Sequence, residues 1–113
     1  MKVEELTPLP KNKVHFKLAS FKIVPKEAGC YVLTTFDNDI LYIGNSVNLN
    51  DRFKQHLDSS EKTNPTKDGK AIWFYFMPYD PMNLPKLERT WINHFDAMHG
   101  RLPIMNKVNS PVS

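Results

Sequence analysis

Apolar residues are grouped most clearly in the middle of the chain. The stretches 30–36 and 40–43 are rich in β-branched and aromatic residues, which is the composition of β-strands. The segment 37–39 between them contains only aspartate and asparagine, which tolerate a left-handed backbone and suit a tight connection. We therefore predict an antiparallel hairpin. Gly44 is predicted to end its second strand, because glycine permits close backbone approach or a positive φ.

Helical periodicity follows the hairpin directly. Leu49, Phe53 and Leu57 recur every four residues, which predicts a helix with one buried stripe. Either Ser46 or Asn48 can cap the start of this helix.

A second apolar stripe predicts another helix over 81–98. Asn83 is a candidate cap, Pro85 fits a first turn and Gly100 ends the pattern. The stripe, at spacings of 3, 4, 4 and 3, consists of Leu84, Leu87, Trp91, Phe95 and Met98.

The segment between the two helices divides into a loop and a strand. Residues 58–70 are polar and include Pro65 and Gly69, which predicts a loop. Residues 71–77 are apolar, too short for a helix and of strand composition, so we predict a central buried strand there.

These elements, in the order β-β-α-β-α, predict a small α/β (α+β) domain with a central three-stranded, mainly antiparallel sheet flanked by helices. We assign this domain to residues 28–108, an N-terminal arm or lead-in to 1–27, and a tail to 109–113. Within the lead-in, apolar residues alternate over 14–18, a run that allows a short edge strand.

Composition excludes several classes of protein. With 41% hydrophobic and 24% charged residues, the chain is expected to fold rather than to remain disordered. Its single cysteine, Cys30, excludes an internal disulfide framework and a multi-cysteine zinc site. The net charge of +3 only mildly favours a polyanionic partner. No apolar run is long enough to span a bilayer and no targeting segment is visible, so we expect a cytoplasmic protein without a membrane partner.

Polar residues form a second row on the first predicted helix. Asn48, Arg52 and His56 are also four residues apart and lie about 100° around the helix from the apolar stripe. An arginine fork beside an imidazole suits a phosphate, because both donate hydrogen bonds to oxygen. A solvated helix face is the alternative interpretation.

Glu88 is unusual because it borders the apolar side of the second predicted helix. Its neighbours three, four and seven residues on are Trp91, Ile92 and Phe95. A carboxylate partly removed from water needs a cation or several donors. A divalent metal is one possibility, and an ion pair with a nearby arginine or lysine is the other.

A family resemblance connects these observations. The tripeptides at 29–31 (GCY) and 42–44 (YIG) place two tyrosines eleven residues apart. Together with the residues that follow them in order, they resemble the GIY-YIG nuclease family over 29–106. These later residues are Arg52, His56, the helical Glu88 and Asn106.

The resemblance implies a metal-dependent endonuclease that hydrolyses DNA to 5′-phosphate and 3′-hydroxyl ends. It implies that Glu88 is the single protein ligand of a Mg²⁺ ion, which Mn²⁺ can replace, and that Arg52 stabilises charge on the scissile phosphate. One site tyrosine would activate the attacking water. We favour Tyr31 as this base, with Tyr42 orienting the water or the phosphate, although the resemblance leaves their roles open.

Two further residues are implied to support this chemistry. His56 would orient the base or accept a proton through water, and Asn106 would fix the geometry of a tyrosine or of the glutamate. The aromatic residues Trp73, Tyr75 and Tyr79 are candidate stacking platforms for DNA, and for Trp73 and Tyr75 a place in the core is the alternative.

The sequence departs from the family pattern at two positions. Cys30 stands where isoleucine or valine is commoner, and it fills the same kind of small buried slot. Asn45 stands where many relatives carry lysine or arginine, so one positive charge is missing.

No separate DNA-binding domain is recognisable after Asn106. We therefore expect low sequence specificity and action on single-stranded or branched DNA rather than on a defined duplex site. A catalytically inactive nucleic-acid-binding module with the same fold is the alternative, and the oligomeric state stays open.

Overall fold

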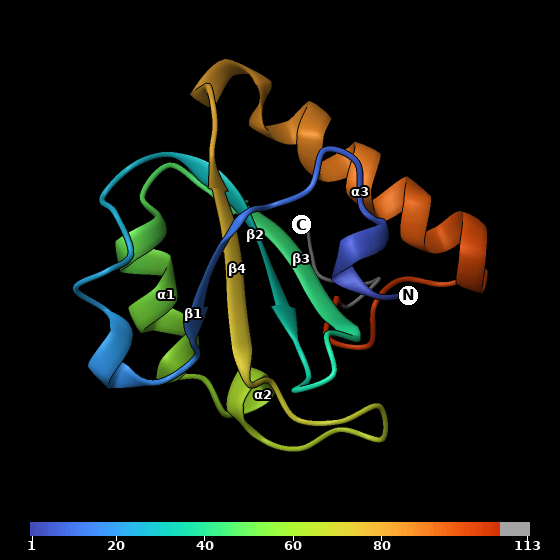
Figure 1. The fold of residues 1–113 in the computed structure, drawn as a ribbon, viewed down its shortest axis with the longest axis horizontal. Coiled ribbons are helices and arrows are strands. Elements are labelled where there is room, and N and C mark those ends of the chain that lie inside the picture. Colours follow the sequence, from blue (N-terminus) through green and yellow to red (C-terminus); the bar gives the residue numbers. More distant parts are fainter. Residues whose placement is uncertain (107–113) are drawn as a thin grey trace.

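An antiparallel sheet with a helix against each face forms the frame of the molecule (Figure 1). The structure is a computed structural model, and it describes residues 1–106. The strands are β1 (Asn12–His15), β2 (Gly29–Thr34), β3 (Ile40–Ser46) and β4 (Trp73–Pro78). The α-helices are α1 (Leu49–Leu57), α2 (Ser60–Thr63) and α3 (Leu84–His99), and short 3₁₀ turns are η1 (Val3–Glu5), η2 (Leu18–Ser20) and η3 (Pro81–Asn83). None of these helices is both long and apolar enough to cross a membrane.

The sheet contains four strands in the order β1-β4-β2-β3, so the prediction of three strands is wrong. The additional strand is β1, which spans Asn12–His15 and pairs with β4. It overlaps only partly with the run at 14–18 that allowed an edge strand. Val14 and Phe16 are buried, whereas Leu18 is 65% exposed since the chain turns into η2 there. A two-residue apolar pattern on an edge strand is too short to be distinguished from a loop by periodicity.

The residues before β2 are packed into the fold. Val3 and Leu6 are buried in the cluster that covers α3, and the indole Nε1 of Trp91 donates to the main-chain oxygen of Pro8 at 3.0 Å. The lead-in therefore contributes to the core as well as to the sheet.

The predicted hairpin is confirmed, and its turn contains Asn38 in a left-handed conformation, with φ of 71°. Gly44 does not end the second strand, because β3 continues to Ser46. Instead, a Cβ atom at Gly44 would lie only 2.7 Å from the hydroxyl oxygen of Tyr31. Close approach, and not backbone conformation, thus explains this glycine.

The helix boundaries differ from the prediction in detail. Asn48 caps α1, since its side chain accepts from the main-chain N–H of Asp51 at 3.1 Å. The predicted second helix begins as the 3₁₀ turn η3, and α3 starts only at Leu84, without a side-chain cap from Asn83. Gly100 ends α3 with φ of 68°. The short helix α2 lies within the stretch predicted as a loop, because a single helical turn has no periodic stripe.

Two apolar clusters lie on opposite faces of the sheet. Helix α1 contributes Leu49 and Phe53 to the cluster that contains Tyr31, and α3 contributes Leu87 and Trp91 to the cluster that contains Cys30. Figure 1 shows α1 in green and α3 in orange on the two sides of the strands. Strand β3 is at the edge of the sheet, where side chains from the α1 face and from the α3 face come close to each other. The candidate site lies at this edge.

Candidate active site

Tyr31 and His56 form a buried hydrogen-bonded pair on the α1 face. The Tyr31 hydroxyl lies 2.6 Å from His56 Nε2, and the two residues are 0% and 8% exposed. Burial raises the pKa of Tyr31 well above its ordinary value, while the Arg52 charge opposes the rise. Burial, with the positive charges of Lys62 and Arg52, lowers the pKa of His56 to about 3.

At neutral pH the imidazole of His56 is therefore uncharged, and its Nε2 atom is hydrogen-bonded to the Tyr31 hydroxyl. The alternative of a solvated helix face is wrong for His56, because its ring points into the core.

Tyr42 is the more accessible of the two site tyrosines. It is half-buried on β3, with ring centroids 5.9 Å from Tyr31 and 5.3 Å from His56. The Lys62 ammonium lies 4.6 Å from the centroid of its ring. Burial raises the pKa of Tyr42, whereas its hydrogen bond with Tyr31 and the charge of Arg52 lower it.

Arg52 extends from α1 to the end of β3. Its Nη1 donates to the main-chain oxygen of Asn45 at 3.3 Å, and its Nε donates to Gln55 Oε1 at 3.1 Å. The guanidinium is only partly buried, so most of its donors stay available for a phosphate.

Glu88 meets β3 from the α3 face. Its Oε1 accepts a hydrogen bond from the Asn45 side-chain Nδ2, and within residues 1–106 it forms no ion pair. Among these residues the donor to the carboxylate is an amide, and not an arginine or lysine as the ion-pair alternative required. Burial raises the pKa of Glu88, and both the Asn45 hydrogen bond and the Arg52 charge lower it.

A surface hollow of about 310 Å³ brings Glu88 and Tyr42 together at the β3 edge. Its walls also include Lys62, Ile92, Leu102 and Asn106. Tyr31 lies behind Tyr42 and does not line the hollow. The open space thus has the carboxylates of Glu88 and Glu61, the Lys62 ammonium, a phenol and an amide around it.

Asn106 takes a different partner from the one implied by the resemblance. Its Oδ1 accepts from the main-chain N–H of Ile43 at 2.9 Å, and its Nδ2 donates to the Ile43 main-chain oxygen at 2.8 Å. The side chain thereby satisfies the open edge of β3 beside Tyr42. It fixes the strand that carries the tyrosine, and not a tyrosine or glutamate side chain.

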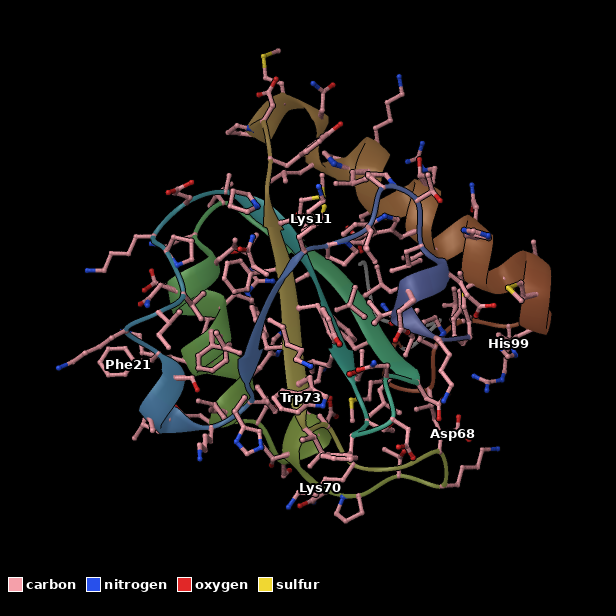
Figure 2. All side chains as sticks on the ribbon, in the orientation of Figure 1. Lys11, Phe21, Asp68, Lys70, Trp73 and His99 are labelled. Atoms are coloured by element: carbon pink, nitrogen blue, oxygen red, sulfur yellow. The ribbon has the colours of Figure 1, made fainter. Side chains whose placement is uncertain are left out.

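Two of the three aromatic residues proposed as stacking platforms, Tyr75 and Trp73, lie apart from the site. Tyr75 is buried in the core. Trp73 pairs with Thr34 and Asn45 with Cys30, four residues apart on β2 and hence roughly 13 Å along the strand. Figure 2 shows Trp73 at the start of β4, near Lys70.

Asn45 is a site residue whose role the sequence did not reveal. Its side chain contacts Glu88, and its main chain contacts Arg52. The available signal was its position directly after the second tripeptide, where the sequence departs from the family pattern.

The donor set suits a hard cation held by few protein ligands. Among residues 1–106, no group of three or more histidine, cysteine, aspartate or glutamate side chains is placed to hold a metal. Glu88 Oε2 accepts no hydrogen bond from these residues, and its carboxylate faces the hollow. A single carboxylate oxygen completed by water is typical of Mg²⁺ sites, so Glu88 fits this ion.

Comparison with known proteins assigns the chain to a family. The GIY-YIG catalytic domain matches residues 27–101, more than half of the 113 residues. This chain belongs to the GIY-YIG family. The family is one of nucleases, so its membership supports a nuclease function and confirms the resemblance of the two tripeptides.

Two curated relatives show how much is shared. UvrABC system protein C of Prochlorococcus marinus (strain NATL2A) is 34% identical over 62 residues, which are 54% of this chain and 9% of that protein. The protein of the same name from Lactobacillus delbrueckii subsp. bulgaricus (strain ATCC BAA-365 / Lb-18) is 34% identical over 41 residues, 36% of this chain and 7% of that protein. The matched part thus spans less than a tenth of the length of these relatives.

Proposed function

We propose that this GIY-YIG protein is a divalent-metal-dependent DNA endonuclease that leaves 5′-phosphate and 3′-hydroxyl ends. The observation that supports this most directly is the junction at Asn45. Through this one residue, the Arg52 guanidinium and the Glu88 carboxylate are held at the same end of β3, and Glu88 shares a hollow with the Tyr42 side chain.

Arg52 and Glu88 would each stabilise negative charge on a different part of the phosphodiester, Arg52 directly and Glu88 through a bound metal ion. Arg52 binds non-bridging phosphate oxygens and stabilises the negative charge that grows on them as the phosphorus becomes five-coordinate. Glu88 holds the Mg²⁺ ion, for which Mn²⁺ can substitute. This ion, when bound, neutralises charge on the phosphate and on the leaving 3′ oxygen.

We place Tyr42 at the attacking water, in contrast to the preference for Tyr31 that the sequence suggested. Tyr42 lines the hollow, while Tyr31 is fully buried behind it. Neutral His56 is hydrogen-bonded to the Tyr31 hydroxyl and holds it in place. The hydrogen bond between the two tyrosines favours ionisation of Tyr42. Tyr31 and His56 therefore orient Tyr42, which would act as the base in its tyrosinate form: the phenol first loses its own proton to solvent, a loss that the Arg52 charge favours, and the tyrosinate oxygen then takes a proton from the attacking water.

The expected substrate preference depends on the charged groups at the candidate site. Guanidinium, ammonium and carboxylate groups contact phosphates and cations and carry no base sequence information. We therefore propose low sequence specificity and a preference for single-stranded or branched DNA, whose backbone bends more readily than a duplex into a site at a sheet edge.

The test is a cleavage assay with labelled single-stranded, flapped and duplex DNA in Mg²⁺, Mn²⁺ or EDTA. The wild type is expected to cut in either metal and not in EDTA. The variant Glu88→Gln should lose more than about 100-fold in rate, since changes in outer-shell partners alone cost 10–100-fold. Asp96→Asn, on the exposed side of α3, is the matched control and should cut normally.

Two outcomes would contradict this function. DNA binding without cutting in any metal would instead support the inactive binding module. Cutting by Glu88→Gln at the wild-type rate would mean that the activity resides elsewhere.

A further inference from the structure

We propose that Asn45 is a positioning residue that makes Glu88 a one-oxygen metal ligand and thereby selects Mg²⁺ or Mn²⁺ over Ca²⁺. This inference rests on the proposed function, because it concerns the same carboxylate. It differs from that proposal in assigning metal selectivity to a residue outside the two tripeptides.

The fold brings Asn45 to Glu88 on the α3 side of the sheet. Asn45 pairs with Cys30 of β2, so the two side chains point to the same face. Cys30 is buried against α3, with its Sγ 3.7 Å from the Leu84 main-chain oxygen. Glu88 stands one turn further along the same helix, beside Asn45 at the strand edge.

The packing of α3 keeps this contact in place. Leu84, Leu87 and Trp91 are buried on both sides of Glu88 in the helix sequence. The helix therefore cannot rotate the carboxylate away from β3 without exposing large apolar side chains.

The contact leaves the two carboxylate oxygens in different states. The Asn45 amide nitrogen is a donor only, and it takes Oε1. Oε2 accepts nothing from residues 1–106, and the carboxylate borders the hollow shared with Tyr42 and Asn106. A cation there meets one oxygen of Glu88, because using both would require the amide to leave.

One-oxygen coordination discriminates between cations. Ca²⁺ takes six to eight oxygens and often binds a carboxylate through both of them, whereas Mg²⁺ requires an octahedral shell and keeps several waters. The wall of the hollow offers one free oxygen of Glu88, the carboxylate of Glu61 and the Lys62 ammonium. These are too few oxygen ligands for Ca²⁺, whereas Mg²⁺ completes its shell with water.

A side-chain substitution at Asn45 isolates this effect. Arg52 is held by the main-chain oxygen of Asn45, and not by its amide. The variant Asn45→Ala therefore removes the donor to Glu88 and keeps the acceptor for Arg52. Asn45 is on the surface-facing end of β3 and only half-buried, which makes the variant compatible with folding.

The experiment uses the full chain without DNA and measures Mn²⁺ binding by electron paramagnetic resonance, with Mg²⁺ or Ca²⁺ as competitor. In the wild type Mg²⁺ should displace Mn²⁺ at lower concentration than Ca²⁺. In Asn45→Ala the ratio of the two competing concentrations should shift toward Ca²⁺ by about tenfold, as outer-shell changes typically do. Asn93→Ala on the exposed side of α3 is the control and should keep the wild-type ratio.

Asn45→Asp provides a second, near-isosteric variant. It replaces the donor by a carboxylate, so Ca²⁺ should gain more affinity than Mg²⁺ does. If both variants keep the wild-type ratio, the role of Asn45 is overturned while the metal site stands. If Mn²⁺ binds equally well to Glu88→Gln, the metal site of the proposed function fails, and the role of Asn45 fails with it.

A metal-free readout checks the contact itself. The side-chain amide protons of Asn45 are followed by nitrogen-15 nuclear magnetic resonance in the wild type and in Glu88→Gln. A hydrogen bond to the carboxylate predicts slowed exchange and a clear shift of one proton, which Glu88→Gln reduces. Exchange as fast as that of an exposed asparagine in the wild type would refute the inference.

Discussion

The two faces of the sheet supply the candidate site with opposite kinds of group. On the α1 face, Tyr31 and His56 are buried and uncharged and lie 2.6 Å apart. On the α3 face, Glu88 is half-buried, borders an open hollow and keeps one carboxylate oxygen without a donor from the described residues. Tyr42 on the edge strand is the side chain that reaches both regions.

The difference shows which region carries stability and which carries chemistry. A buried neutral pair loses its hydrogen bond and leaves an unsatisfied group when either partner is changed, so the cost appears as unfolding. A half-exposed charged group can be rehydrated when its neighbour is changed, so the cost appears in the reaction it stabilises. The following predictions test this division, beginning with the largest effect.

The two tyrosines should respond in opposite ways to loss of the hydroxyl. Tyr42→Phe is expected to lower the cleavage rate by about 10²–10⁴-fold, the range of general acid–base catalysis, with a nearly unchanged free energy of unfolding. Tyr31→Phe leaves His56 Nε2 buried without its hydrogen-bond partner, which should cost about 1–3 kcal/mol of stability. Urea denaturation and single-turnover cleavage measure the two effects. Equal loss of stability in both variants would contradict the division.

Arg52 should matter for the reaction more than for binding. Arg52→Ala is expected to lower the cleavage rate by about 10²–10³-fold, the cost of one donor to a developing negative charge. DNA affinity should fall only a few-fold, because one phosphate contact is a small part of the total. Rate and dissociation constant are measured on the same DNA, with Lys54→Ala on the same helix as the control. A matching drop in rate and affinity would make Arg52 a simple docking contact.

A substitution at Gly44 tests the effect of steric crowding at the site, and one at Gly100 tests the effect of backbone strain alone. A Cβ atom at this position would lie 2.7 Å from the Tyr31 hydroxyl oxygen and 2.8 Å from Tyr42 Cε2. Gly44→Ala should therefore destabilise the fold by about 1–3 kcal/mol, as overpacking does, and should also reduce cleavage by displacing both tyrosines. Gly100→Ala is the control, since Gly100 has φ of 68° and no atom within 4 Å of an added Cβ. It should lower stability by backbone strain alone and leave the cleavage rate unchanged at a temperature where it is folded.

Acid should weaken the buried region first. The pKa of His56 is about 3 in the fold, against 6.5 ordinarily, so the unfolded chain binds a proton between these values that the folded chain does not. Stability is then fully present above pH 6.5 and falls as the pH decreases toward 3, by at most about 1.4 kcal/mol per pH unit. Glu88 acts in the opposite direction, because its raised pKa lets the folded chain bind a proton earlier.

The measurement is urea denaturation between pH 7.5 and 4.5 for the wild type and for His56→Gln. Glutamine keeps an acceptor for Tyr31 but does not titrate. The variant should therefore show a shallower loss of stability, and parallel curves would show that His56 is not the group responsible.

Local patterns predicted several elements well. The 37–39 turn, the Asn48 cap and the Gly100 stop each depend on neighbouring residues in the chain, and the structure contains all three. The prediction was wrong where partners are distant. β1 is defined by pairing with β4 some sixty residues later, and no pattern within 12–15 records that partner.

For the candidate site too, the sequence indicated the residues but not their distant contacts. Residue order indicated the tyrosines, Arg52, His56, Glu88 and Asn106 as candidates, through resemblance to the family. Residue order did not indicate that Asn106 would bind the main chain of Ile43 or that Asn45 would bind Glu88. Both contacts join segments more than forty residues apart.

The sequence by itself determined which chemical groups are available to this protein and where the hairpin, strand β4 and the helices α1 and α3 lie. It did so because hydrophobic period, caps and turn residues act over a few neighbouring positions. Only the tertiary structure decided that one tyrosine is buried and the other open, and that an asparagine occupies one oxygen of the glutamate. Burial and hydrogen bonding of these groups depend on side chains brought together by sheet pairing and helix packing, which sequence distance does not encode.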